Sequence, residues 1–177
     1  FSGDKLVGGP QCGIVVGKKV LIDRLKRNQL TRALRCDKMT YAVLAATLRL
    51  FLDEGTLLAR HPVLKMLTMT EEEIEARARQ LFAKLEDLLS GHGTLAVVRD
   101  TSEAGSGSLA GFALPTWVVR LVVHGLTAET LGQRLRHGDV PVIARISDDA
   151  IVLDCRTICD EEIPDIVDSL TSIVSGT

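Results

Sequence analysis

A helix from Thr70 to Leu89 is the feature of this sequence that most restricts its fold. Thr70 and Glu73 form a capping box, in which each side chain accepts a hydrogen bond from the other residue's backbone N–H. Apolar residues then recur at helical spacing: Ile74, Ala78, Leu81, Phe82, Leu85, Leu88 and Leu89. Gly91 and Gly93 end the pattern. An amphipathic helix of this length must bury its apolar stripe against other elements of a domain.

The residues after this helix indicate what it packs against. Strands are predicted at 94–100, 117–123, 141–146 and 150–155, the last two as a hairpin around Ser147-Asp148-Asp149. Thr127 can cap a helix that ends at Arg136, and Asp160 can cap a last helix with Pro164 in its first turn. The pattern predicts a small α+β domain, with helices on one face of a mostly antiparallel sheet.

The first third of the chain has a different pattern. Residues 12–17 (CGIVVG) are almost wholly apolar and predict a buried strand, and residues 18–27 predict a basic helix. A long apolar helix is expected over 31–53, followed by a loop at 59–69 that contains Pro62. We place a domain boundary in the region Gly55–Met69, with a first domain at 1–56 and a second at 57–177.

Composition excludes several classes of function. The 177 residues carry a net charge of −2 with a pI near 6.1, so the whole chain has no bulk attraction to nucleic acid or anionic membrane. The four cysteines form no CxxC pair and the four histidines are scattered, which argues against a metal site. No apolar run approaches the roughly 20 residues that cross a bilayer. We expect a cytoplasmic protein with reduced thiols and no membrane partner.

Lys5 is the first candidate for chemistry. A lysine in a loop among glycines can form a Schiff base with an aldehyde cofactor, and Asp4 beside it can orient the amine or move a proton. The sequence Gly8-Gly9-Pro10-Gln11-Cys12-Gly13 can bind an anion through its backbone N–H groups. The alternatives are a surface loop with a solvated Asp-Lys pair and a tight turn that leads into the strand.

Arg32 and Arg35 are the second candidates. Three residues apart on a helix, they would share one face and could hold a phosphate through two guanidinium groups. Two arginines at a helix N-terminus oppose the helix dipole, and an anionic partner would explain this conflict. The alternative is a solvated basic face. Gly105-Ser106-Gly107-Ser108 could also hold a phosphate, although a flexible hairpin loop is the better interpretation.

Several blocks of the sequence, in order, resemble one family. Residues 1–19 (FSGDKLVGGPQCGIVVGKK), 32–40 (RALRCDKMT) and 45–52 (AATLRLFL) are similar to segments of bacterial selenocysteine synthase, L-seryl-tRNA(Sec) selenium transferase. Later matches are GSGSL at 105–109 and PVIARI at 141–146. Cys12 stands where the family usually has alanine, and no proposed functional group is lost.

The resemblance implies a pyridoxal 5′-phosphate (PLP) enzyme of fold type I, an α/β protein with an aminotransferase-like large domain. This chain would be a C-terminal fragment, with the end of the large domain followed by the small α+β domain. The implied reaction converts seryl-tRNA(Sec) to selenocysteinyl-tRNA(Sec) with selenophosphate, in a homo-oligomeric ring of dimers. Lys5 aligns with the Schiff-base lysine, and Asp4 with an aspartate implicated in catalysis. Arg32 and Arg35 align with arginines that hold the phosphate-like donor, and Gly8 and Gly9 are expected at the cofactor.

Two other interpretations remain open. The protein could be a related PLP-dependent lyase that acts on a small amino acid without tRNA. It could also be a non-catalytic fragment that serves only in assembly. The expected tRNA-binding part, and most of the cofactor pocket, would lie upstream of Phe1.

Overall fold

The computed structural model describes residues 1–105 and 111–176, which divide into two compact units. Phe1–Thr68 belong to the first unit, and Met69–Ala104 with the described residues from Gly111 onward form the second. The division lies at the far end of the region Gly55–Met69. The residues between 57 and 68 therefore belong with the first unit rather than with the second.

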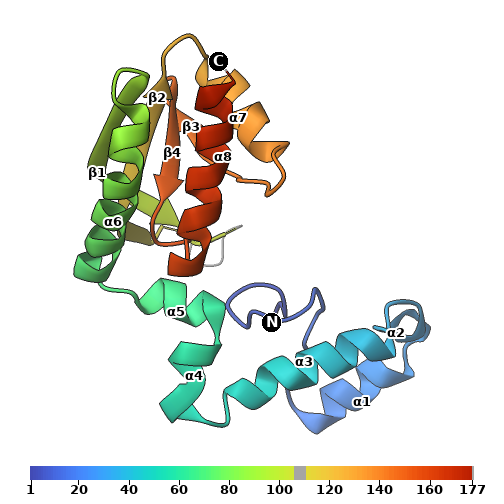
Figure 1. The fold of residues 1–177 in the computed structure, drawn as a ribbon. Helices are drawn as coiled ribbons and strands as arrows, with labels where there is room; N and C mark the ends of the chain where they lie inside the picture. Colours follow the sequence, from blue (N-terminus) through green and yellow to red (C-terminus); the bar gives the residue numbers. More distant parts are fainter. Residues whose placement is uncertain (106–110, 177) are drawn as a thin grey trace. The chain divides into compact units, whose positions relative to one another are not determined.

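The first unit is a Gly-rich loop followed by five helices (Figure 1). The helices are α1 (Lys19–Arg27), α2 (Gln29–Ala33), α3 (Lys38–Leu50), α4 (Glu54–Arg60) and α5 (Pro62–Thr68). The helix predicted at 18–27 is confirmed as α1. The single helix predicted over 31–53 is wrong, because the chain leaves the helical conformation after Ala33. Asp37 then caps α3 by accepting a hydrogen bond from the Thr40 N–H at 2.8 Å.

Two other predictions for the first unit are wrong. Residues 12–17 form no strand, since the only pairing found there among the described residues is an isolated antiparallel bridge between Ser2 and Gly13. Val15 and Val16 are 66% and 69% exposed. The predicted loop at 59–69 is largely α5, because Pro62 occupies the first helical position, where its missing N–H costs no hydrogen bond.

The second unit is a four-stranded antiparallel sheet with helices packed on one face (Figure 1). Its strands are β1 (Gly93–Glu103), β2 (Ala113–Val123), β3 (Arg145–Ser147) and β4 (Ala150–Asp154), in the order β1-β2-β4-β3. Its helices are α6 (Glu71–Leu89), α7 (Ala128–Arg136), the 3₁₀ turn η2 (Asp160–Glu162) and α8 (Ile163–Ser175). This arrangement is the predicted α+β domain.

The core of the second unit follows from strand alternation. Val119, Leu121 and Val123 of β2 point to the helical face and are at most 3% exposed. They meet the stripe of α6 that the sequence predicted, and Leu81 and Leu85 in this stripe are fully buried. The sheet and its covering helices therefore share one continuous hydrophobic core.

Local interactions determine where several of these elements begin and end. The capping box of α6 is confirmed, with Glu73 N–H donating to Thr70 and Thr70 N–H donating to Glu73. The predicted hairpin is also confirmed, and Asp148 and Asp149 form its turn with φ of 49° and 54°. Asp160 does not cap α8 directly, since it begins the 3₁₀ turn η2 that precedes it.

Among the helices of the described residues, none combines the length and the apolar character that a bilayer-spanning segment needs.

Candidate active site

The loop that carries Lys5 is closed by backbone hydrogen bonds at its base. Gly3 N–H donates to the Cys12 carbonyl at 2.9 Å, and Ile14 N–H donates to the Phe1 carbonyl at 2.8 Å. A Cβ on Gly3 would lie 2.5 Å from the Cys12 Sγ atom, so only glycine fits at this crossing. Residues 4–11 thus form a loop that these hydrogen bonds and the isolated Ser2–Gly13 bridge close.

Lys5 and Asp4 lie together on this loop. The Lys5 Nζ atom is 3.3 Å from Asp4 Oδ2, and the two side chains are 39% and 27% exposed. The Ser2 hydroxyl donates to Asp4 Oδ1 at 2.5 Å. This hydrogen bond lowers the pKa of the Asp4 carboxyl, and the neighbouring Lys5 ammonium lowers it further. The pair is a reachable amine next to a carboxylate that stays ionised.

Gly8 and Gly9 shape the loop, and their hydrogen bonds favour the tight turn over the anion-binding nest for this segment. Gly8 N–H donates to the Lys5 carbonyl at 2.8 Å, and Gly9 N–H donates to the Gly3 carbonyl at 2.7 Å. Both donors are thus used inside the loop. Gly8 has φ of +67°, a conformation that side chains with a Cβ rarely adopt.

Arg32 and Arg35 do not share a helix face, which corrects the prediction. Arg32 lies in the last turn of α2, and Arg35 lies in the extended segment before α3. At the last turn a cation agrees with the helix dipole, so the predicted conflict with the dipole disappears. Both side chains are exposed, and within residues 1–105 and 111–176 neither guanidinium has a hydrogen bond or ion pair. They are therefore two cations available to an anion.

His61 is the residue of this region that sequence reasoning missed. It is 1% exposed, and its ring Nε2 lies 2.9 Å from the carbonyl oxygen of Val7, two residues after Lys5. Its position directly before Pro62 could have indicated a helix cap, but the loop predicted at 59–69 concealed it. The Lys5 loop is therefore attached to the start of α5.

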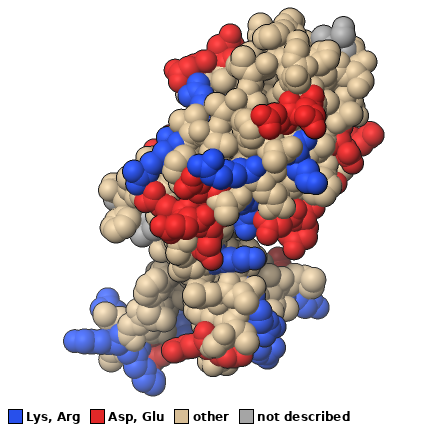
Figure 2. Space-filling model, turned by 60° about the vertical axis from the view of Figure 1, so that its left-hand side comes forward, with Lys and Arg blue, Asp and Glu red and all other residues tan. Residues whose placement is uncertain are grey.

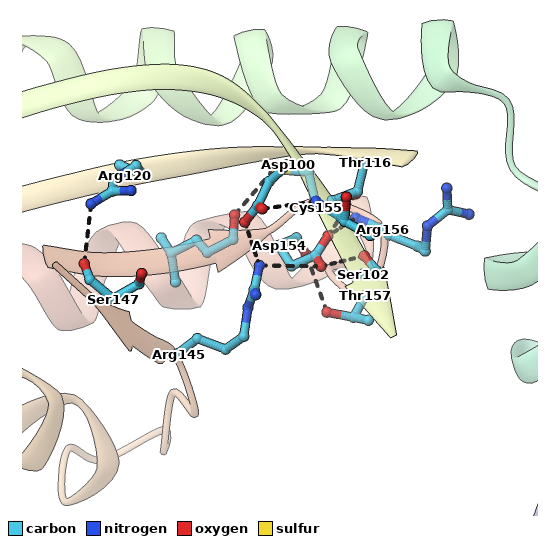
Figure 3. A network of polar contacts seen from close by, with 12 residues as sticks. Asp100, Ser102, Thr116, Arg120, Arg145, Ser147, Asp154, Cys155, Arg156 and Thr157 are labelled. Atoms are coloured by element: carbon cyan, nitrogen blue, oxygen red, sulfur yellow. Dashed lines mark hydrogen bonds and ion pairs between the residues drawn. The ribbon is translucent and has the colours of Figure 1, made fainter. Parts of the chain in front are cut away.

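The second unit contains a polar cluster that the sequence analysis also did not predict (Figure 3). Asp154, at the end of β4, accepts hydrogen bonds from the hydroxyls of Ser102 at 2.5 Å and Thr116 at 2.8 Å. Arg145 of β3 bonds Asp100 of β1 at 2.8 Å and lies 3.9 Å from Asp154. The cluster links all four strands through side chains, so its role in the sheet is structural.

The thiol next to this cluster is not a nucleophile. Cys155 is fully buried, and this burial, together with the nearby Asp154 carboxylate, raises the pKa of its thiol to about 12. A thiol with such a pKa stays protonated at neutral pH. The proposed phosphate loop at Gly105–Ser108 falls mostly on residues outside those that the structure describes.

The charge of the chain is divided between its two parts. Residues 1–68 contain 12 Lys and Arg against 5 Asp and Glu, whereas residues 69–177 contain 9 against 18. The net charges are therefore +7 and −9, which the overall value of −2 conceals. Figure 2 shows acidic and basic side chains next to one another over the second unit, where Arg99 pairs with Glu71 and Arg145 with Asp100. Because its net charge is positive, the first unit is the part of the chain that attracts anions electrostatically.

Comparison with solved structures identifies the class of fold. The structure of D-glucosaminate-6-phosphate ammonia-lyase matches 96% of this chain and 41% of that chain, with a TM-score of 0.57 and 22% sequence identity. The chain therefore has the α/β-type fold found in part of that enzyme.

Comparison of sequences identifies the family. The profile of the L-seryl-tRNA selenium transferase family matches residues 1–159. L-seryl-tRNA(Sec) selenium transferase of Geobacter sulfurreducens is 42% identical over 175 residues, which are 99% of this chain and 38% of the relative. The enzyme of that name from Alkaliphilus metalliredigens is 44% identical over 173 residues, 98% of this chain and 37% of the relative. The chain belongs to the L-seryl-tRNA selenium transferase family and spans less than two fifths of these relatives.

Proposed function

We propose that this chain is part of a PLP-dependent enzyme that converts seryl-tRNA(Sec) to selenocysteinyl-tRNA(Sec), with selenophosphate as the selenium donor. Membership of the selenium transferase family supports this reaction. The active protein is then a cytoplasmic homo-oligomer, and this chain supplies one part of each active site.

Lys5 and its loop fit the cofactor. The Lys5 amine is accessible, and an aldehyde can bond it covalently. PLP, when bound, supplies an electron sink for carbanion chemistry at the amino acid. Asp4 lies 3.3 Å from the amine and, as an ionised carboxylate, can orient it. Gly8 and Gly9 add no side chain that would keep a cofactor away from the loop.

Arg32 and Arg35 are the proposed groups for the phosphate of the donor. Two exposed guanidinium groups without internal partners among the described residues can each form charge-assisted hydrogen bonds to a phosphate. The net charge of +7 in residues 1–68 adds a longer-range attraction for a phosphorylated donor and for tRNA.

The observation that carries the proposal is the Asp4–Lys5 pair on its closed loop, within a chain of this family. It is tested by adding PLP to the full-length protein that contains this sequence, reducing with borohydride and mapping the labelled peptide. We expect the label on Lys5, and we expect Lys5→Ala to abolish it together with selenium transfer. Lys18→Ala removes an exposed lysine outside the loop and serves as the matched control. A label on another lysine, or full activity of Lys5→Ala, would contradict the proposal.

The arginines distinguish selenium transfer from the related lyase reaction. Loss of a charge-assisted hydrogen bond costs about 1.5–3 kcal/mol, so Arg32→Ala and Arg35→Ala should each slow selenium transfer roughly 10- to 100-fold. Labelling of Lys5 by PLP should not change. Arg27→Ala, an exposed arginine of α1, is the control. Unchanged transfer in both variants would favour a lyase that acts on a small amino acid without a phosphorylated donor.

A further inference from the structure

His61 is an unusual residue within the first unit. Of the residues that the structure describes in Phe1–Thr68, only His61 and Gly3 are buried. A buried imidazole has lost its hydrogen bonds to water. Both of its ring nitrogens therefore need hydrogen-bond partners within the protein. The two partners found for His61 come from different elements.

Each ring nitrogen of His61 has a defined role. The Leu64 N–H donates to Nδ1 at 3.2 Å, and Leu64 is the third residue of α5, so His61 caps this helix. Because Nδ1 accepts, Nε2 carries the hydrogen and donates to the Val7 carbonyl at 2.9 Å. The imidazole thus connects the start of α5 to the loop of Lys5.

The ring is also held by contacts on its sides. The Phe51 ring meets it edge to face, with the ring centroids 5.1 Å apart and the planes at 74°. A Cβ on Gly8 would lie 2.5 Å from the ring atom Cε1, so the glycine at +67° allows the loop to lie directly against the imidazole. Gly8 N–H in turn donates to the carbonyl of Lys5 itself.

We infer that His61 is a positioning residue, which acts through the Val7 carbonyl and Gly8 to fix the direction in which the loop presents the Lys5 amine. This inference rests on the proposed role of Lys5. A covalent bond to a bound aldehyde requires the amine in a narrow geometry, and small displacements slow such steps strongly. Loss of one hydrogen bond worth about 1 kcal/mol should slow attachment of the cofactor roughly fivefold.

Three variants of the full-length protein separate the roles of the two ring nitrogens of His61. His61→Asn keeps an acceptor that caps α5 but is too short to reach Val7, whereas His61→Gln is long enough to donate to the Val7 carbonyl. His61→Leu removes both interactions. His124→Asn changes an exposed histidine of the second unit and is the control.

Two measurements are made on each variant. The first is the rate at which added PLP becomes attached to Lys5, followed by borohydride reduction at timed intervals and peptide mapping. The second is hydrogen exchange of the Gly8 and Gly9 amides, which needs no cofactor. We expect His61→Asn and His61→Leu to show slower attachment and faster exchange, while His61→Gln and His124→Asn stay within about twofold of the unaltered protein.

The outcomes separate this inference from the proposed function. Unaltered attachment and exchange in His61→Asn would overturn the positioning role. Equal damage in all three His61 variants, with a common loss of thermal stability, would overturn it too, because a merely structural role gives no rescue by Gln. Absence of label on Lys5 in the unaltered protein would contradict the proposed function, and the exchange of Gly8 and Gly9 would still decide whether His61 fixes the loop.

Discussion

The two units differ in what holds them together. All buried apolar side chains among the described residues belong to the second unit, where α6, α7 and α8 share a core with the sheet. In the first unit the apolar residues of α1 and α3 are largely exposed, for example Val20 at 72% and Met39 at 70%. Backbone hydrogen bonds, helix caps and the contacts of His61 connect the elements of the first unit.

This difference teaches that an apolar pattern specifies structure only where it meets a second apolar surface. The stripe of α6 has a sheet to pack against, and the stabilisation amounts to roughly 25 cal/mol per Å² of apolar surface removed from water. Residues 12–17 have the composition of a buried strand without a partner strand among the described residues. They therefore take no regular structure, despite a pattern as apolar as that of β4.

The largest difference between the two units is expected when one leucine of each unit is replaced by alanine. Leu85→Ala opens a cavity in the core of the second unit and should lower its free energy of unfolding by about 2–5 kcal/mol. Leu25→Ala, at a residue 49% exposed in α1, should change it by less than about 0.5 kcal/mol. Urea unfolding followed by fluorescence of Trp117, the single tryptophan of this sequence, measures the effect in the second unit, and hydrogen exchange of the α1 amides measures the effect in the first. Equal effects would mean that the two units do not differ as described.

A smaller effect is expected from the polar cluster of the sheet. Asp154→Asn replaces one carboxylate oxygen with an NH2 group, which cannot accept a hydrogen bond, so the hydroxyl of Ser102 or Thr116 loses its acceptor. We expect a loss of about 1–3 kcal/mol in the same urea experiment. Asp139→Asn, at an exposed aspartate outside the cluster, should have no effect. A stable Asp154→Asn protein would show that the cluster adds nothing to the core.

The smallest effect is expected in the pH dependence of stability. The Thr101 N–H and then the Arg145 guanidinium lower the pKa of Asp100, so the folded state favours its charged form. The resulting stabilisation is present above the ordinary pKa of about 3.9 and is lost as pH falls through the lower pKa of the folded state. Because the Asp100–Arg145 pair is partly exposed, we expect less than about 1 kcal/mol. Asp100→Asn should therefore unfold with a slightly weaker pH dependence below pH ~4, measured by urea unfolding at several pH values.

The sequence predicted the second unit well because its elements are specified locally. The capping box at Thr70, the alternation of β2 and the turn at Asp148-Asp149 each depend on residues close in the chain. In the first unit the break between α2 and α3 was missed. It depends on Asp37, whose capping role was hidden inside a continuous apolar pattern.

The candidate site was predicted in part. Asp4 and Lys5 could be found because adjacent residues on a glycine loop meet in any fold. The spacing of Arg32 and Arg35 predicted a shared helix face that the structure lacks. The contact of His61 with the Lys5 loop could not be predicted, because 54 residues separate it from Val7 and no local pattern joins a cap of α5 to that loop.

The turn between β3 and β4 restricts which substitutions are compatible with this fold. Asp148 and Asp149 both have positive φ, which glycine or asparagine adopts more readily. Yet Asp148 binds Arg120 of β2 at 3.3 Å, and Asp149 accepts from the Ala128 N–H at the start of α7 at 3.3 Å. A change of this pair to Asn-Gly would relax the backbone, but it would remove the charge that pairs with Arg120 and the acceptor of the Ala128 N–H. In related chains, replacement at Asp148 should therefore occur together with a change at Arg120, while Asp149 can become asparagine alone, since an amide oxygen still accepts from Ala128.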